Sequence, residues 1–298
     1  MKEFLIRLAA FGGIALAGYA LLLWATIYLN TRATQHCRFG PETEYVLLGD
    51  SHTMWSIDDS RIDGLRNVSL NAEGYRYTYA KLVHILDNEP TIKKVYIGVG
   101  YHNLSSYFDD YIDGHQFRHF AYRYLGILAG ADYAHLLTHD PASFPGLTLA
   151  LIRSGLPAGL KQKCLLYGSF PSEHRSEAFS FESMQKRIRE QYHDGEKVAA
   201  ESKSNEAYLQ RIVDLCRARG IPVAIVNTPL HPEYEKRIPD VYRRAYRQFI
   251  SRNGLEHYGF DDLELGDASF LPDGDHLNYE GAVRATKAFA RYHESSIK

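Results

Sequence analysis

The first feature of the hydrophobic pattern is an uncharged apolar stretch, residues 8–29, with the sequence LAAFGGIALAGYALLLWATIYL. At about 1.5 Å of rise per residue, a helix of this length crosses the ~30 Å hydrocarbon core of a bilayer. The stretch is longer than the apolar region of a signal peptide, and no A-x-A cleavage pattern follows it. We therefore predict an uncleaved transmembrane signal anchor over residues 1–30, with a cleaved signal peptide as the alternative.

After a polar linker at residues 31–44, apolar runs alternate with segments of helical periodicity. Short β-branched and aromatic runs predict buried strands, and apolar residues spaced three and four apart predict amphipathic helices. The alternation predicts an α/β fold, a three-layer sandwich in which helices flank a mostly parallel sheet. The predicted strands are 45–48, 66–70, 93–100, 221–229 and 255–262, and the predicted helices are 75–88, 182–219 with a break near 193–195, 231–254 and 279–294.

Residues 104–180 interrupt this alternation, because they are irregular, rich in Tyr, Phe and His, and contain four prolines. We interpret them as an insertion into a single domain at residues 45–298. The sequence leaves open whether the insertion is a lid, a partner surface or part of a binding site.

Composition adds little about partners. A formal net charge of −2 gives no reason to expect nucleic acid as a partner. The three cysteines have no metal-ligand spacing and the histidines are scattered, so we expect neither a metal nor a cofactor. Cys37 and Cys164 are able to form one disulfide in an oxidising compartment, although nothing in the sequence requires it, and Cys216 lies in an apolar helical pattern.

Candidate chemistry begins at Ser51, in VLLGDSHTMW (residues 46–55), where a predicted strand ends. Reactive groups of α/β proteins collect in the loops at the carboxyl ends of the strands. A serine hydroxyl becomes a nucleophile when a base takes its proton and a third group holds the tautomer of that base. The stretch FLPDGDHLNYEGA offers His276 as the base and, three residues earlier, Asp273 as its partner, with Asp275 as the competing carboxylate.

These two blocks, LLGDSH and PDGDHLN followed by GA, resemble the first and last signature blocks of the SGNH (GDSL-like) hydrolase superfamily. The closer resemblance is to membrane-anchored members that act on cell-envelope polymers, such as the D-alanine transfer protein of teichoic acids and the alginate O-acetylation proteins. The resemblance spans residues 45–294 as short blocks. It implies an SGNH-hydrolase, flavodoxin-like fold in which Ser51 is the nucleophile, His276 the general base and Asp273 its partner.

The resemblance also implies an oxyanion hole made of the Ser51 backbone N–H, a glycine N–H from the second block and an asparagine side chain from the third. Gly74, in NVSLNAEGY, fits the second block. The third block departs from the family pattern G-x-N-D, because residues 100–103 read Gly-Tyr-His-Asn and no aspartate follows. Asn103 is the predicted third donor, and His102 is the alternative.

Together these patterns predict an SGNH-type enzyme with a Ser-His-Asp triad. We expect a serine-dependent O-acyltransferase that moves a small acyl group, most simply acetyl, onto an extracytoplasmic polysaccharide. The alternatives are a carbohydrate esterase of the same fold and a catalytically inactive glycan-binding or scaffold domain. Three positive groups precede the span, namely the amino terminus, Lys2 and Arg7, and two follow it, Arg32 and Arg38. Because the more positive side stays in the cytoplasm, this small difference predicts that the domain lies on the periplasmic side of the cytoplasmic membrane. The expected partners are an acyl donor, an envelope glycan and, as the resemblance implies, a multi-pass membrane-bound O-acyltransferase.

Overall fold

The computed structural model describes residues 1–112, 114, 116–128, 130–139, 142, 144–171, 173 and 175–297. The chain divides into two compact units, each with its own internal contacts. The first unit comprises Met1–Cys37 and His115–Leu166, and the second comprises Arg38–Gly114 and Tyr167–Lys298.

The first unit is helical and begins with α1 (Lys2–Gln35), which includes the first five residues of the predicted linker. Among the described residues, α1 is the one helix long and apolar enough to cross a membrane, and none of its most apolar window is buried. The last turns of α1 are different, because they pack on α6 (Phe144–Leu160). There the side-chain amide of Asn30 donates a hydrogen bond to the Gly155 carbonyl at 2.9 Å.

Cys37 and Cys164 form a disulfide in this unit, with their Cα atoms 5.5 Å apart. The bond joins the segment after α1 to the segment after α6, so it closes the helical unit covalently. The other described elements of the first unit are η4 (Phe117–His119), η5 (Ala121–Tyr124) and α5 (Gly130–His139).

The second unit is built on a five-stranded sheet in the order β2-β1-β3-β6-β7, and every neighbouring pair is parallel. This confirms the predicted α/β fold, and the order is that of flavodoxin-like doubly wound sheets. The strands are β1 (Tyr45–Leu48), β2 (Leu65–Asn67), β3 (Lys94–Gly98), β6 (Val223–Val226) and β7 (Glu256–Tyr258).

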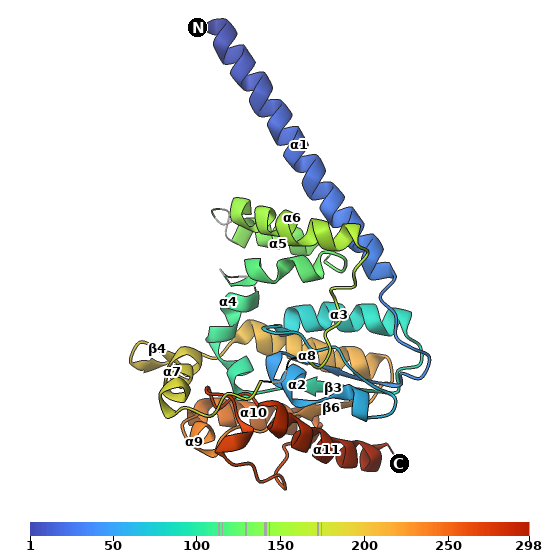
Figure 1. Ribbon diagram of the computed structural model, residues 1–298, viewed down its shortest axis with the longest axis vertical. Helices are drawn as coiled ribbons and strands as arrows, with labels where there is room; N and C mark the ends of the chain where they lie inside the picture. The colour runs from blue at the N-terminus through green and yellow to red at the C-terminus, as the bar shows by residue number, and fades with distance from the viewer. Residues whose placement is uncertain are drawn as a thin grey trace. The chain divides into compact units, whose positions relative to one another are not determined.

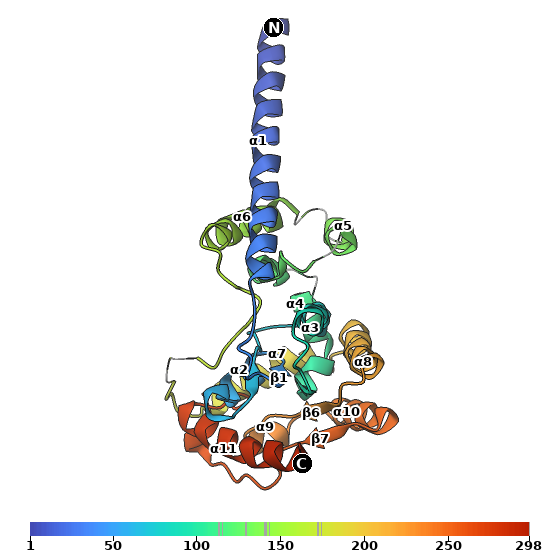
Figure 2. The same ribbon diagram turned by 90° about the vertical axis from the view of Figure 1, so that its right-hand side faces the viewer.

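The hydrophobic core lies on both faces of this sheet. Val46 and Leu48 pack with residues of α3, α8 and α10, whereas Leu47 between them packs with residues of α11, because successive side chains of a strand point to opposite faces. Figures 1 and 2 show α3 and α8 on one side of the strands and α11 on the other. The helices of this unit are α2 (Ser51–Ser56), α3 (Tyr75–Asn88), α4 (Asp109–Ile112), α7 (Phe181–Tyr192), α8 (Lys203–Ala218), α9 (Pro232–Glu235), α10 (Asp240–Asn253) and α11 (Tyr279–Ser296), with short 3-10 turns between some of them.

Two predicted helices are interrupted in the structure. The segment 182–219 divides into α7 and α8 around the hairpin of β4 (His193–Asp194) and β5 (Lys197–Val198), which confirms the expected break. The single helix predicted over 231–254 was wrong, because α9 ends before α10 begins. Pro239 accounts for this break, since proline cannot donate the helical hydrogen bond and disfavours a helical residue before it.

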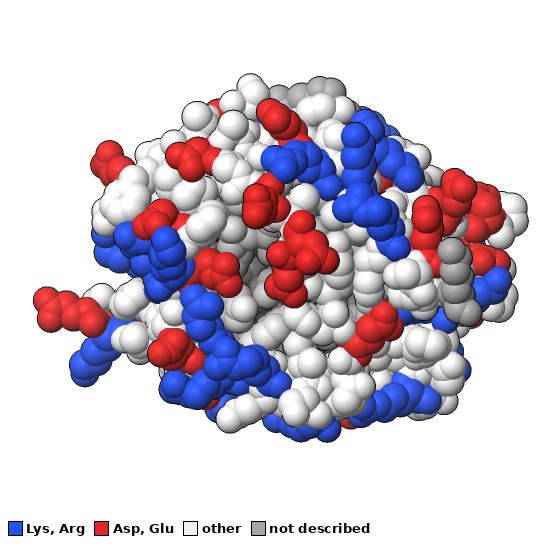
Figure 3. All heavy atoms as spheres, turned by 90° about the horizontal axis from the view of Figure 1, so that it is seen from below, with Lys and Arg blue, Asp and Glu red and all other residues white. Residues whose placement is uncertain are grey.

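Charged side chains of both signs are mixed on the face of the molecule drawn in Figure 3. Acidic side chains border the hollow near the middle of that face, and basic side chains lie around it in small groups. A continuous basic field would attract polyanions such as nucleic acids, and the face drawn in Figure 3 does not carry one.

Candidate active site

The candidate site lies where the strand order of the sheet reverses, at the carboxyl ends of β1 and β3. From β1 the chain passes to β2 on one side and then crosses to β3 on the other. In doubly wound sheets this topology leaves a crevice outside the strand ends, because the two connections lead away in opposite directions. Ser51 begins α2 directly after β1, and Asp50 caps that helix by accepting a hydrogen bond from the His52 backbone N–H at 2.9 Å.

Gly49 sets how closely the start of α2 approaches the sheet. A Cβ atom added to Gly49 would lie 2.4 Å from Thr53 Oγ1 and 3.2 Å from the Cα of Gly98, the last residue of β3. A larger side chain would therefore have to move the Thr53 side chain or shift the start of α2 away from β3. This close approach is a steric reason for glycine at position 49, directly before Asp50 and Ser51.

His276 reaches Ser51 from a tight loop, residues 270–277, whose ends pair as an antiparallel bridge. Gly274 in this loop has a φ of +71°, a left-handed conformation that glycine adopts without strain. The loop places His276 Nδ1 2.8 Å from Asp273 Oδ2 and His276 Nε2 2.8 Å from Ser51 Oγ. The structure thus brings the three residues predicted as a triad into one hydrogen-bonded chain.

Asp275, the competing carboxylate, also contacts the imidazole, with Oδ1 3.0 Å from His276 Nδ1. Its side chain is fully buried, whereas that of Asp273 is 30% exposed. The other oxygen of Asp275 accepts hydrogen bonds from Arg187 Nε at 2.8 Å and Gln191 Nε2 at 2.9 Å, both on α7. A buried carboxylate is costly unless it is paired with a cation. The ion pair with Arg187 therefore stabilises the charge of Asp275 in its buried position beside His276.

A second histidine, His52, joins Asp275 to Asp50. Its Nδ1 lies 3.0 Å from Asp50 Oδ1 and its Nε2 lies 3.3 Å from Asp275 Oδ2. Ionised carboxylates only accept hydrogen bonds, so both ring nitrogens of His52 carry a proton when both bonds form. The ring of His52 stacks on that of His276, with the two centroids 4.3 Å apart. A positive charge on His52 is therefore next to the ring predicted to be the base.

Asp50 lies at the centre of a buried polar network. Its Oδ2 accepts hydrogen bonds from His102 Nε2 at 2.7 Å and Asn103 Nδ2 at 2.8 Å. Burial would raise the pKa of Asp50, but the neighbouring His52 and His102 lower that pKa well below its usual value. Burial, followed by repulsion from His52, lowers the pKa of His102 to about 4. At neutral pH the network therefore holds an ionised Asp50 and an uncharged His102.

The pKa of His276 is shifted in the opposite direction. Burial opposes a charge on the ring, but attraction by Asp275 and then by Asp273, with a hydrogen bond to each, outweighs burial and raises the pKa from 6.5 to about 10. The resting imidazole is therefore protonated at neutral pH. Loss of that proton at alkaline pH would leave a strong base 2.8 Å from the Ser51 hydroxyl.

Two residues predicted for the oxyanion hole lie in different settings. Gly74 precedes α3, and none of the described residues accepts a hydrogen bond from its backbone N–H or from that of Ser51. The Asn103 side chain is buried, with Nδ2 bound to Asp50 and Oδ1 accepting from the Gly100 N–H at 2.8 Å. One amide hydrogen of Asn103 is left for another partner. The roles of Gly74 and Asn103 stay predictions.

Two of the groups around the predicted triad, Arg187 and Gln191, have no distinctive signal in the sequence. Arg187 and Gln191 lie one helical turn apart on α7, a spacing that occurs on any helix face, and only their contact with Asp275 distinguishes them. Asp50 was adjacent to the predicted nucleophile in the sequence. Its partner His102 is 52 residues away, and only folding shows that the two meet.

The chain has weak similarity to known proteins. A family model matches residues 182–298, which is less than half of the chain and excludes Ser51. No curated protein matches. One similar solved structure is a candidate platelet activating factor from Streptococcus pneumonia, with a TM-score of 0.40 and 11% sequence identity, and the match covers 96% of this chain and 98% of that one. Another is a candidate acylhydrolase from Bacteroides fragilis NCTC 9343, with a TM-score of 0.40 and 10% identity, and the match covers 92% of this chain and 99% of that one.

Proposed function

We propose that this protein is a serine-dependent O-acyltransferase that moves a small acyl group, most simply acetyl, onto an extracytoplasmic polysaccharide. The observation that carries the proposal is the hydrogen-bonded chain from Ser51 Oγ through His276 to Asp273, with 2.8 Å at each side of the imidazole. This is the arrangement by which a base activates a serine hydroxyl and a carboxylate holds the tautomer of that base.

In the first half of the proposed reaction, Ser51 Oγ attacks the carbonyl carbon of the acyl donor while His276 Nε2 takes the hydroxyl proton. The bond from the carbonyl carbon to the leaving heteroatom breaks, and His276 returns the proton to that atom, which leaves an acyl-serine. In the second half, a sugar hydroxyl attacks the acyl-serine as His276 takes its proton. Ser51 Oγ then leaves and recovers the proton.

The negative charge that develops on the carbonyl oxygen needs nearby hydrogen-bond donors. The proposed donors are the backbone N–H groups of Ser51 and Gly74, which have no acceptor among the described residues, and the side chain of Asn103. Removing one donor of this kind typically lowers kcat by about 10²–10³-fold.

The first unit supports a location at the outer face of the cytoplasmic membrane. Helix α1 is long and apolar enough to cross a bilayer once. Disulfides persist in oxidising compartments, so the Cys37–Cys164 bond favours a place outside the cytoplasm for the chain that follows α1. In this position the protein would meet its glycan acceptor, and a multi-pass membrane-bound O-acyltransferase is the proposed supplier of the acyl group.

The test is a burst assay on the full chain in detergent, with p-nitrophenyl acetate as donor and a panel of oligosaccharides as acceptors. Ser51→Ala and His276→Ala remove the proposed nucleophile and base. Ser251→Ala, an exposed serine on α10, is the matched control. We expect a burst in the wild type and in the control, no burst in Ser51→Ala, and acetylated saccharide as a product.

Two other outcomes would change the proposal. A Ser51-dependent release of acetate that no saccharide accelerates, with no acetylated sugar, would identify a carbohydrate esterase instead. Equal rates for the wild type and Ser51→Ala would overturn the acyl-serine mechanism and leave the inactive glycan-binding or scaffold domain as the alternative.

A further inference from the structure

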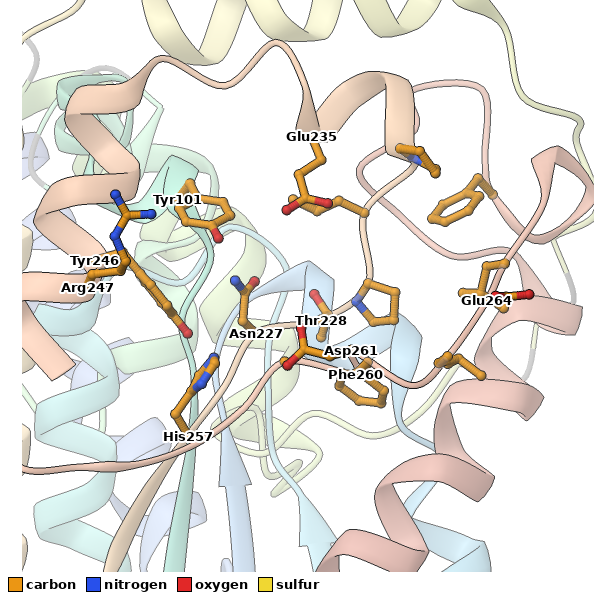
Figure 4. A pocket seen from close by; sticks show the side chains of 17 residues that line it. Tyr101, Asn227, Thr228, Glu235, Tyr246, Arg247, His257, Phe260, Asp261 and Glu264 are labelled. Atoms are coloured by element: carbon orange, nitrogen blue, oxygen red, sulfur yellow. The ribbon is translucent and has the colours of Figure 1, made fainter. Parts of the chain in front are cut away.

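A cavity of about 530 Å³ lies in the second unit at the carboxyl ends of β3, β6 and β7, and it is not part of the Ser51 site. Figure 4 shows side chains from the loops after these strands and from α10 around it. Cavities of this size commonly hold small ligands. Its lining includes Tyr101 after β3, Asn227 and Thr228 after β6, Phe260 after β7, and Tyr246 and Arg247 from α10.

Two buried polar atoms in the lining lack hydrogen-bond partners. Asn227 is 9% exposed and Tyr246 is 4% exposed. The Asn227 side chain lies beside the Tyr246 hydroxyl and partly offsets the burial that raises the pKa of Tyr246, but neither Asn227 Oδ1 nor this hydroxyl has a partner with hydrogen-bond geometry among the described residues. An unsatisfied buried polar group typically costs about 1–3 kcal/mol. Figure 4 shows Asn227 and Tyr246 as neighbouring side chains around the cavity, with His257 near the hydroxyl end of Tyr246. A ligand with hydroxyl groups would satisfy both atoms, since a hydroxyl both donates and accepts.

The lining combines aromatic rings with these polar atoms. Tyr101, Tyr246, His257 and Phe260 all line the cavity, and Tyr101 and Tyr246 lie with their ring centroids 5.1 Å apart. An aromatic face binds the apolar C–H face of a flat ligand, while polar atoms at its edge bind the hydroxyls. A sugar ring has both kinds of surface.

The charge of the lining restricts which sugar fits. Glu235, Asp261 and Glu264 line the cavity, against the single Arg247, and Glu235 also lies 3.6 Å from Arg243. Burial lowers the pKa of His257 despite the nearby Asp261, so His257 adds no positive charge at neutral pH. Carboxylates repel an anionic ligand and accept hydrogen bonds from a neutral or cationic one.

We propose that this cavity is a subsite for a sugar ring that carries no acid group. This inference rests on the proposed function only in identifying that sugar as part of the acceptor glycan. Neighbouring strands are about 4.8 Å apart, so the part of the cavity over β6 and β7 lies roughly 10–15 Å along the sheet edge from β1, the strand that Ser51 follows, and the part at Tyr101 lies nearer. Segment 270–277 connects the two places, because Phe270 lines the cavity and His276 contacts Ser51. An oligosaccharide held in the cavity would thus present another of its rings to the nucleophile.

The experiment is calorimetric titration of the full chain carrying Ser51→Ala, which prevents turnover, in a detergent without a sugar headgroup. The probes are chitotetraose, cellotetraose and mannotetraose as neutral oligosaccharides and tetragalacturonate as the anionic one. Tyr246→Phe removes only the unpartnered hydroxyl. Tyr167→Phe is the matched control, because the Tyr167 hydroxyl is also buried without a hydrogen-bond partner among the described residues but lies outside the cavity.

We expect at least one neutral probe to bind and tetragalacturonate to bind more weakly. Loss of one hydrogen bond predicts that Tyr246→Phe weakens binding roughly two- to tenfold. The melting temperature of the free protein should stay the same or rise, because the change removes a buried hydroxyl that has no partner there. Tyr167→Phe should bind as tightly as its parent. Absence of binding by every neutral probe, tighter binding of tetragalacturonate, or equal effects of Tyr246→Phe and Tyr167→Phe would overturn the inference.

The two proposals fail separately. Ser51-dependent acyl turnover in a protein that binds none of the neutral probes overturns the sugar subsite and leaves the proposed function standing. Sugar binding that depends on the Tyr246 hydroxyl, in a protein without Ser51-dependent turnover, supports the subsite and overturns the acyl-serine mechanism.

Discussion

The unusual feature of the site is that two carboxylates share the Nδ1 hydrogen of one imidazole, and this predicts an alkaline activity profile. Asp273 Oδ2 lies 2.8 Å and Asp275 Oδ1 3.0 Å from His276 Nδ1. Their attraction raises the pKa of His276 from 6.5 to about 10 after the opposing effect of burial. That rise corresponds to roughly 5 kcal/mol in favour of the imidazolium, and the side chain is only 12% exposed.

With a pKa of about 10, His276 is unprotonated in about one free enzyme molecule in a thousand at pH 7. If His276 is the base, kcat/KM should therefore rise about tenfold per pH unit and level off near pH 10. Asp275→Asn removes the largest attraction and leaves Arg187 to repel the charge on His276. We expect this change to move the profile toward neutral pH. Asp273→Asn should move it less, because the attraction of a 30% exposed carboxylate is screened by water.

The assay is kcat/KM for p-nitrophenyl acetate across this pH range, with the Ser51→Ala rate subtracted as background. Asp214→Asn, an exposed carboxylate on α8, is the control and should leave the profile unchanged. A wild-type profile that levels near pH 6.5 would refute the reasoning. Superimposable profiles for the wild type and Asp275→Asn would also refute it.

Stability gives a second measurement of the same shift. Because the folded pKa of His276 lies above its unfolded value, its contribution to stability is fully present below pH 6.5 and is lost as pH rises through about 10. The melting temperature of the wild type should therefore fall over this range. In Asp275→Asn this fall should be smaller, although the variant is less stable overall because Arg187 loses its buried partner.

Three further predictions concern stability, each read by thermal unfolding of the full chain in detergent. Lys81 and Glu73 form a fully buried ion pair at 2.7 Å, so Lys81→Met should destabilise the fold by about 3–5 kcal/mol, and a neutral effect would contradict the pairing. The Cys37–Cys164 bond spans 127 residues, so its reduction should lower stability by about 4–5 kcal/mol, whereas the Cys37→Ala variant should not respond to reductant. The pKa of Asp50 in the folded protein lies well below its ordinary value of 3.8, so the contribution of Asp50 to folding stability is present above about pH 3.8 and is lost as pH falls through the folded pKa. The Asp50→Asn variant should therefore be less stable than the wild type at pH 7, and the difference should become smaller in acid.

The sequence alone determined the features that depend on neighbouring residues. The apolar stretch that becomes α1, the strand patterns and the helix at 75–88 all follow from local periodicity, because one buried face imposes that spacing. The pairing of Asp273 with His276 is also local, since three residues of tight loop bring the two side chains together. The break at Pro239 shows where periodicity alone failed, because it extended one helix across a residue that ends it.

The tertiary structure decided which distant elements meet. The strand order β2-β1-β3-β6-β7 places the ends of β1 and β3 side by side, and no local pattern encodes that order. Arg187 reaches Asp275 across 88 residues, and the stacked rings of His52 and His276 come from opposite ends of the chain. The pKa values of the site follow from these long-range contacts, because burial and neighbouring charges are set by the packing of whole elements. Sequence motifs were therefore enough to predict Ser51 and His276 as site residues, whereas the charges and burial around them depend on the tertiary structure.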